Sequence, residues 1–336
     1  MKYTFLFILV FTRISFCQQL NCSAFITQGN KILLAKNLDF ELCEGLVLFN
    51  PAGIEKNSLS NYGTSWNSKF ASITFNMFGL NLPLGGINSE GLAIEELSTY
   101  PVQYKDSGES KLNEFELIQY ILDNYATVNE IERNLDKISV DRFYFTIHYI
   151  ICDSFGNNAV LEYHNGSAKY ITGNEFKYKV LTNNNYTELL KYKNLYVPSP
   201  HRKLDHNTSQ DRFLKIINEL NEQFTTEKYN TIGGMMDILD SVRVEDTQWS
   251  IVYELKEKEM HYKTLVNNQI RNIRFNTFAN KKGYYFSSID DGINFREFNR
   301  EINKIYLESL MQKVLTSGSD PQSELVLKLK KLKDKS

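Results

Sequence analysis

The chain is poor in cysteine and histidine, with four and five of these residues among 336. The histidines are scattered, and no cysteine and histidine group has the spacing of metal ligands, so neither a metal nor a cofactor is expected. Once the N-terminal segment discussed below is removed, only Cys22, Cys43 and Cys152 remain. Three cysteines are too few for a disulfide framework, although a single Cys43–Cys152 bridge is possible in an oxidising compartment.

An excess of charge of one sign is also missing. The 38 Lys and Arg residues and the 40 Asp and Glu residues give a formal net charge of -2. Neither nucleic acid nor an anionic membrane is therefore expected as a partner. No glycine-rich phosphate loop follows a predicted strand, and no internal repeat is evident.

The hydrophobic runs are short. The apolar run from Tyr3 to Phe11 is too short to cross a bilayer as a stable helix, and no membrane span is expected. It follows a positive start and precedes Ser15-Phe16-Cys17, a pattern that predicts a signal peptide and an exported protein, whether periplasmic, extracellular or lumenal. Cys17 as a lipid-carrying cysteine is the alternative, and the large Phe16 argues against it.

What the chain does contain is enough apolar sequence for a large core, with 42% hydrophobic and 13% aromatic residues. Alternating apolar residues predict strands, and apolar residues three and four positions apart predict helices. The predicted strands cover residues 143–151, 159–163, 168–172, 249–254 and 261–266. The predicted helices cover residues 112–125, 127 onward, 212–224, 233–239 and 300–315. Blocks of strands that alternate with blocks of helices favour an α+β fold over a parallel βαβ sheet.

Cys22 is the clearest candidate for a reactive residue. If signal cleavage follows Cys17, removal of Gln18 to Asn21 would make Cys22 the first residue. An N-terminal cysteine carries its own α-amine, which titrates near neutrality and can accept the thiol proton. Nucleophile and base would then belong to one residue.

Four separated segments contain candidate polar partners for this thiol. Each has an ordinary structural explanation when taken alone, such as a buried thiol, a turn residue or an ion pair at the start of a helix. The segments are Asn21-Cys22-Ser23 with Lys36-Asn37-Leu38-Asp39, Asn88-Ser89-Glu90-Gly91-Leu92, Leu181-Thr182-Asn183-Asn184-Asn185, and Asp211-Arg212-Phe213-Leu214.

In this order, from Cys22 to about Val266, the segments resemble the choloylglycine hydrolase family, which contains bile salt hydrolases and penicillin V acylases. That family belongs to the N-terminal nucleophile hydrolases. The resemblance implies a four-layer αββα fold with two stacked antiparallel sheets. With the N-terminal segment described above, the chain divides into a signal peptide with a short pro-segment (1–21), a single catalytic domain (22–316) and a basic tail (317–336), which is expected to be flexible or weakly helical.

The resemblance implies a role for each matched residue. Cys22 corresponds to the nucleophile, and Asp39 to the aspartate that orients the free amine. Asn183 corresponds to the asparagine that helps to form the oxyanion hole, and Arg212 to the arginine that completes the polar cluster at the thiol. Two positions depart from the family: Lys36 stands where arginine is usual, and Ser98 stands where asparagine, tyrosine or tryptophan is common. Ser98 is the expected second oxyanion donor.

The implied activity is hydrolysis of a non-peptide linear amide in a small-molecule N-acyl substrate, through a thioester. Conjugated bile salts, penicillin V and N-acyl homoserine lactones are the candidate substrates, and the sequence does not choose among them. Two alternatives stay open: an inactive secreted binding protein on the same scaffold, and a lipid-amide amidase related to acid ceramidase. A homo-oligomer is also possible, but the tetramer of bile salt hydrolases is not assumed, because the segment from Tyr186 to Arg212 is shorter than the assembly insertion of many of them.

Overall fold

The computed structural model describes residues 21–335, with the exception of residues 43, 60–63, 105–110, 135–138, 200–201, 224–229 and 318. The predicted signal peptide and Cys43 lie outside the described residues. Cys152, the other cysteine of the bridge considered above, is a buried free thiol.

The first sheet is antiparallel and places β1 and β2 next to each other. Residue Ser23 pairs with Asn37, so the chain around Cys22 lies beside the end of β2. On its other side β2 pairs with β15, where Thr247 lies opposite Asp39. The strand order is β14 (Val180–Leu181), β1 (Ser23–Gln28), β2 (Ile32–Asp39), β15 (Thr247–Glu254), β16 (Glu259–Thr264) and β17 (Arg271–Arg274).

The second sheet has nine antiparallel strands, and β8 lies near its middle. The strand order is β13 (Ser167–Thr172), β12 (Asn158–His164), β11 (Ile147–Cys152), β8 (Ala93–Ser98), β7 (Pro83–Asn88), β6 (Ser72–Asn76), β3 (Leu46–Asn50), β18 (Tyr285–Ser288) and β19 (Arg296–Glu297). Two small pairs complete the strands: β4 (Glu55–Asn57) with β5 (Ser65–Asn67), and β9 (Lys111–Leu112) with β10 (Ser139–Val140).

The two sheets pack against each other through fully buried side chains. Phe75 of β6 packs edge-on against Tyr253 of β15 and Tyr262 of β16, with ring centroids 6.3 and 5.5 Å apart. Strands β1, β2 and β15 are buried almost throughout, as expected for strands that are covered on both faces. The main core therefore lies between and around the two sheets.

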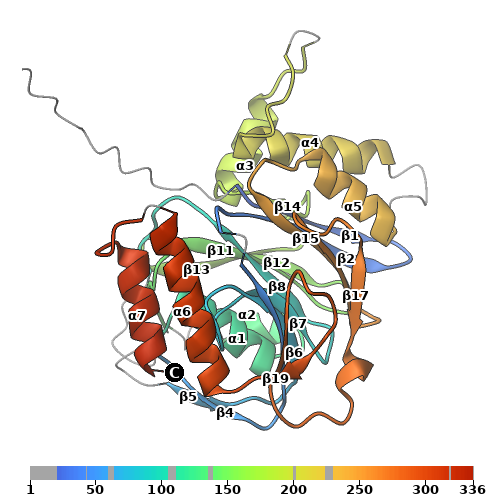
Figure 1. Ribbon diagram of the computed structural model, residues 1–336. Coiled ribbons are helices and arrows are strands. Elements are labelled where there is room, and N and C mark those ends of the chain that lie inside the picture. Colours follow the sequence, from blue (N-terminus) through green and yellow to red (C-terminus); the bar gives the residue numbers. More distant parts are fainter. Residues whose placement is uncertain are drawn as a thin grey trace, which may run out of the picture.

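Helices cover the outer faces of both sheets (Figure 1). The first sheet carries α4 (Ser209–Gln223) and α5 (Ile232–Ser241), with α3 (Tyr186–Leu195) packed beside α4. The second sheet carries α1 (Glu114–Asn124), followed by α2 (Val128–Asn134). Between the last strands of the chain lies a short 3-10 helix, η3 (Phe275–Phe278). This helix–sheet–sheet–helix order confirms the predicted α+β, αββα fold.

The main differences from the predicted elements have local causes. The strand predicted from residue 143 begins only at Ile147, because the backbone N–H groups of Phe143, Tyr144 and Phe145 donate to the Glu114 carboxylate instead of to a neighbouring strand. Helix α3 was not predicted. Only two of its ten residues, Tyr186 and Leu189, are buried, so it lacks a clear apolar stripe.

The C-terminal segment, for which the sequence suggests a flexible or weakly helical tail, forms the second helix of a pair. Helix α7 (Glu324–Lys335) packs along α6 (Arg300–Thr316), as Figure 1 shows. Val326, Leu329 and Leu332 recur every three residues and are buried, and Lys333 of α7 bridges to Glu308 of α6 at 2.6 Å. The apparent alternation of Leu and Lys thus contains a helical face.

Among the described residues, no helix is long and apolar enough to cross a membrane. The same residues contain no group of three or more His, Cys, Asp or Glu side chains that could hold a metal ion.

Candidate active site

Cys22 lies directly before β1 and is completely buried. Burial raises the pKa of its thiol to about 12, against the lowering effect of the Lys36 charge, and nearby Glu96 and Asp39 raise it further. The backbone N–H of Asp39 donates to the sulfur, which partly opposes these effects. The thiol is therefore protonated at neutral pH and needs a base to become a nucleophile.

Asp39 lies at the end of β2, and a single hydroxyl holds it. Thr247 Oγ1 donates to Asp39 Oδ1 at 2.6 Å across the β2–β15 pair. The other carboxylate oxygen, Oδ2, is buried without a hydrogen-bond partner. Burial raises the pKa of Asp39 to about 6, against the lowering effects of the Thr247 hydrogen bond and the charges of Arg212 and Lys36.

Asn183 and Arg212 form one continuous network with the start of β1. Arg212 Nη2 donates to Asn183 Oδ1 at 2.7 Å, and Arg212 Nε donates to Ser23 Oγ at 3.0 Å. The guanidinium has only donors, so it fixes the Asn183 amide with its oxygen toward Arg212 and its NH₂ group away. That NH₂ group donates to the carbonyl and the hydroxyl of Ser98, at 2.9 and 3.0 Å.

The buried environment and the neighbouring carboxylate act in opposite directions on Arg212. Burial lowers the pKa of its guanidinium, while the charge of Asp39 raises it. A further donor, Nη1, binds the His206 carbonyl at 2.9 Å. All three nitrogens of Arg212 are thus engaged with the protein, so the side chain is held in one position beside the thiol.

A second group of charges also lies near the thiol. Lys36 Nζ contacts Glu95 Oε2 and Glu96 Oε1, both at 3.0 Å, and all three side chains are at most 2% exposed. Burial disfavours the ammonium, but the two carboxylates outweigh burial and raise the pKa of Lys36 above its usual value. Burial raises the pKa of Glu95, against the lowering effect of the Lys36 charge.

The structure therefore brings together all six residues that the sequence singled out: Cys22, Lys36, Asp39, Ser98, Asn183 and Arg212. Sequence reasoning missed Ser23 and Thr247, whose hydroxyls position Arg212 and Asp39, and it missed Glu95 and Glu96. The two glutamates could be noticed in the sequence, because adjacent acidic residues in the otherwise apolar stretch Ala93–Leu97 are unusual for a buried strand.

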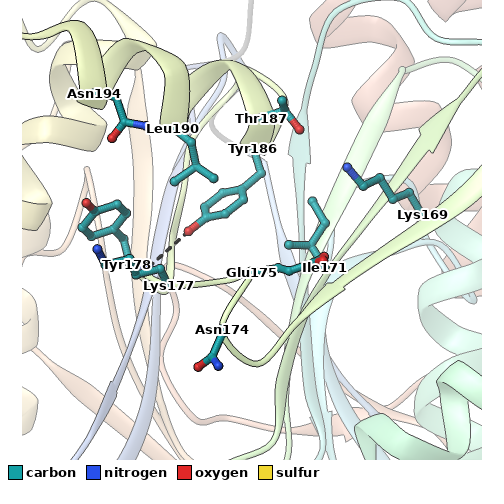
Figure 2. Close-up of a pocket in the computed structure, with 10 residues that line it drawn as sticks. All are labelled: Lys169, Ile171, Asn174, Glu175, Lys177, Tyr178, Tyr186, Thr187, Leu190 and Asn194. Carbon is teal, nitrogen blue, oxygen red and sulfur yellow. Dashed lines mark hydrogen bonds between the residues drawn. The ribbon is translucent and has the colours of Figure 1, made fainter.

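Two of the pockets lined by described residues lie in different parts of the molecule. An open groove between β13, the β13–β14 connection and α3 is lined by residues such as Ile171, Tyr178 and Leu190 (Figure 2). The Tyr186 hydroxyl in it accepts a hydrogen bond from the Tyr178 backbone N–H at 3.1 Å. None of the six candidate residues lines this groove.

The other pocket is small and apolar, and it lies next to the thiol network. Its lining includes Leu38, one residue before Asp39, and Glu96, whose charge acts on the Cys22 thiol. The remaining lining residues are Phe40, Met77, Phe78, Leu84, Phe115 and Phe145. This position makes it the candidate acyl pocket.

Comparison with solved structures places the fold in a class. Penicillin V acylase from Agrobacterium tumefaciens superposes with a TM-score of 0.68 at 21% identity, over 83% of this chain and 98% of that one. A variant of conjugated bile acid hydrolase from Clostridium perfringens superposes with a TM-score of 0.65 at 19% identity, over 83% and 97%. The two stacked sheets between helices thus have the fold of these two amide-cleaving enzymes.

The family follows from the sequence. Residues 22–214 match the family of linear amide C–N hydrolases known as the choloylglycine hydrolase family, and the chain belongs to it. Penicillin V acylase from Pectobacterium atrosepticum is 23% identical over 255 residues, which cover 62% of this chain and 67% of that protein. The match begins at Cys22.

Proposed function

We propose that the protein is an amidohydrolase that cleaves an N-acyl amide with Cys22 as an N-terminal nucleophile. The observation that carries the proposal is the convergence of Cys22, Asp39, Asn183 and Arg212, from four distant segments, in one buried polar network. Each of these residues has an ordinary structural explanation alone. Their convergence at one thiol supports a catalytic explanation.

The α-amine of Cys22 is the base that we assign to this thiol. A thiol whose pKa is raised to about 12 by burial is a poor nucleophile at neutral pH. While Asn21 is attached, the Cys22 nitrogen is an amide and cannot accept a proton. Removal of the residues up to Asn21 would create an amine beside the sulfur, and this step would activate the enzyme.

Asp39 is the residue that we expect to bind this new amine. Its Oδ2 is buried and unpartnered in the chain that still carries Asn21. An α-amine would supply the missing donor, while Thr247 continues to hold Oδ1. The amine would then be oriented toward the sulfur rather than free to rotate.

Asn183 is the hydrogen-bond donor that we assign to the developing oxyanion, and Ser98 is the second donor. The Asn183 NH₂ group already has its orientation fixed by Arg212 and is turned toward Ser98. An amide donates without titrating, so it acts equally over the pH range of the enzyme. A carbonyl oxygen that takes the place of one Ser98 acceptor would receive this donor as negative charge develops.

The proposed reaction has two balanced steps. The Cys22 sulfur bonds to the amide carbonyl carbon and passes its proton to the α-amine, which transfers it to the leaving nitrogen as the C–N bond breaks. A water molecule then gives a proton to the amine and attacks the thioester, which releases the carboxylic acid and restores the thiol. Neither step requires a cofactor.

The substrate class that we propose is a small-molecule amide with an apolar acyl group. The apolar side chains that line the small pocket beside the thiol network support it, because they offer an acyl group mainly apolar contacts. Penicillin V and conjugated bile acids, which name the relatives above, are starting points for assay. Export through the N-terminal apolar segment completes the proposal, because trimming to Cys22 would follow signal cleavage.

The N-terminus provides the test. Two proteins are compared, one that begins at Cys22 and one that begins at Asn21, with penicillin V, a glycine-conjugated bile salt and a set of simple N-acyl amides. Hydrolysis only by the protein that begins at Cys22 is the expected result. Equal hydrolysis by both would contradict the role of the free amine. No hydrolysis by either would favour the secreted binding protein.

A further inference from the structure

The buried charges of Lys36, Glu95 and Glu96 are not balanced, and this imbalance lies next to the nucleophile. Both oxygens of Glu95 have donors, because Oε2 contacts Lys36 and Oε1 accepts from the Tyr253 hydroxyl. Gly85 makes room for this carboxylate, since a Cβ at Gly85 would lie 2.2 Å from it. Glu95 is therefore fully satisfied and fixed in place.

Glu96 differs from Glu95 because one of its two carboxylate oxygens has no hydrogen-bond donor. Its Oε1 contacts Lys36 at 3.0 Å, whereas its Oε2 is buried and has no hydrogen-bond partner. The residue is 1% exposed, so bulk water does not compensate. A buried acceptor without a donor is costly, which makes such an atom a candidate contact for a ligand.

Glu96 is also the only acidic residue among those that line the small apolar pocket. The other seven lining residues are apolar, so none of their side chains offers a hydrogen-bond donor. Its charge is close enough to Cys22 to raise the pKa of that thiol. A group bound in the pocket thus meets one acceptor in an apolar surface, near the atom that attacks the substrate.

We propose that Oε2 of Glu96 selects a substrate whose acyl group carries a hydrogen-bond donor, a hydroxyl or an ammonium group, on an otherwise short apolar chain. The inference rests on the proposed function, because it takes this pocket as the acyl pocket of Cys22. A donor in the acyl group satisfies Oε2, while a plain acyl chain of the same length leaves this oxygen unpaired. One lysine between two glutamates also gives the group a formal charge of -1, which favours an ammonium over a hydroxyl.

The experiment compares matched acyl chains on the same chromogenic anilide leaving group. The chains are short alkanoyl groups that carry a hydroxyl, an amino, a methoxy or a methyl substituent, with the position of the substituent moved stepwise along the chain. For the protein that begins at Cys22 we expect kcat/KM for the best donor chain to exceed that for its methyl partner by about tenfold or more. The amino and hydroxyl series distinguish a charged from a neutral donor.

Glu96→Gln gives a sharper readout than a loss of activity. Lys36 donates to the Gln oxygen, so the NH₂ group of this Gln faces the position of Oε2 and turns an acceptor into a donor. The preference is expected to invert, with the methoxy chain now better than the hydroxyl and amino chains. Ratios between substrates are compared within each enzyme, so a general loss of activity does not affect them. Glu90→Gln, the same change at an exposed turn before β8, is expected to keep the original ratios.

Binding separates this inference from the proposed function. The same amides are titrated calorimetrically into Cys22→Ala, which cannot form the thioester. Turnover with equal kcat/KM for donor and methyl chains would overturn the inference and leave the function intact. A donor preference in binding, lost in Cys22→Ala/Glu96→Gln, without turnover by the wild-type protein would support the inference and overturn the function. Neither turnover nor a donor preference in binding would overturn both.

Discussion

Two groups of polar residues near the Cys22 thiol, called its two sides below, differ in how their charges and hydrogen bonds are matched. On one side, Arg212 donates a hydrogen bond to Asn183, and Asn183 donates to Ser98, so that each side chain is oriented by its neighbour. On the other side, one lysine meets two glutamates, and an oxygen of Glu96 is left without a donor. We assign the amide chemistry to the first side and the choice of substrate to the second.

The largest effect is expected from the residue that both sides share. Cys22→Ala removes the nucleophile and should lower kcat/KM for any amide substrate by at least about a thousandfold, because the remaining groups have no covalent route. Progress curves with the best substrate of the panel measure it. Cys152→Ala removes the other buried thiol among the described residues and should keep most of the activity. Similar activity in the two variants would rule out Cys22 as the nucleophile.

Replacement of Lys36, the cation of the second side, should destabilise the protein. Lys36→Met leaves the carboxylates of Glu95 and Glu96 buried without a counter-charge, and we expect a loss of about 3–5 kcal/mol in the free energy of unfolding. Burial already raises the pKa of Glu95, and the loss of Lys36 raises it further. The folded state then binds more protons than the unfolded state, so the loss should shrink as the pH falls.

Urea unfolding at several pH values measures this loss. Lys263→Met is the matched control, because Lys263 pairs with Asp240, a carboxylate that is 44% exposed, and an exposed partner can be solvated by water. Only about 0–1 kcal/mol is expected from the ion pair there. Equal losses in the two variants would mean that the buried charges of Glu95 and Glu96 do not depend on Lys36.

The two sides also differ in how far the sequence predicted them. Cys22, Asp39, Asn183 and Arg212 were found because their segments appear in a recognisable order. Local patterns predicted β11, β12, β13, β15 and β16 and five of the helices, whereas the arrangement in two stacked sheets followed from the resemblance. Glu95 and Glu96 could not be assigned in this way, because their burial depends on Lys36, which is distant in sequence. Helix α7 could be expected only as a weak helix, for a related reason: its buried face is defined by packing on α6.

A smaller effect is expected from the first side when one donor is removed. Asn183→Ala deletes the NH₂ group that we assign to the oxyanion, and kcat should fall by about a hundredfold or more with a smaller change in KM. Steady-state kinetics measure the split between the two constants. Asn184→Ala, a change of the adjacent buried amide that contacts Glu188, should alter kcat much less. A fall in kcat of the same size in both variants would point to a general structural role.

The smallest expected effect is on the pH dependence of stability. It arises from Asp39 and should change when the residues up to Asn21 are removed. The pKa of Asp39 is raised to about 6 by burial in the chain that retains Asn21, against an ordinary value of 3.8. The folded state therefore holds this proton more tightly than the unfolded state. The stability due to the group is complete below about pH 4 and is lost as the pH rises through 6, a change of about 2–3 kcal/mol.

Asp39→Asn should remove this part of the pH dependence from urea unfolding curves of the chain that retains Asn21. In the protein that begins at Cys22, the new α-amine faces Asp39 Oδ2 as a charged donor and should lower the pKa of Asp39. The wild-type curve should then fall less between pH 4 and 7 after trimming, because the carboxylate gains a partner. Identical curves for the trimmed and untrimmed wild-type chains would show that Asp39 does not bind the amine, and the base at Cys22 would have to be oriented by another group.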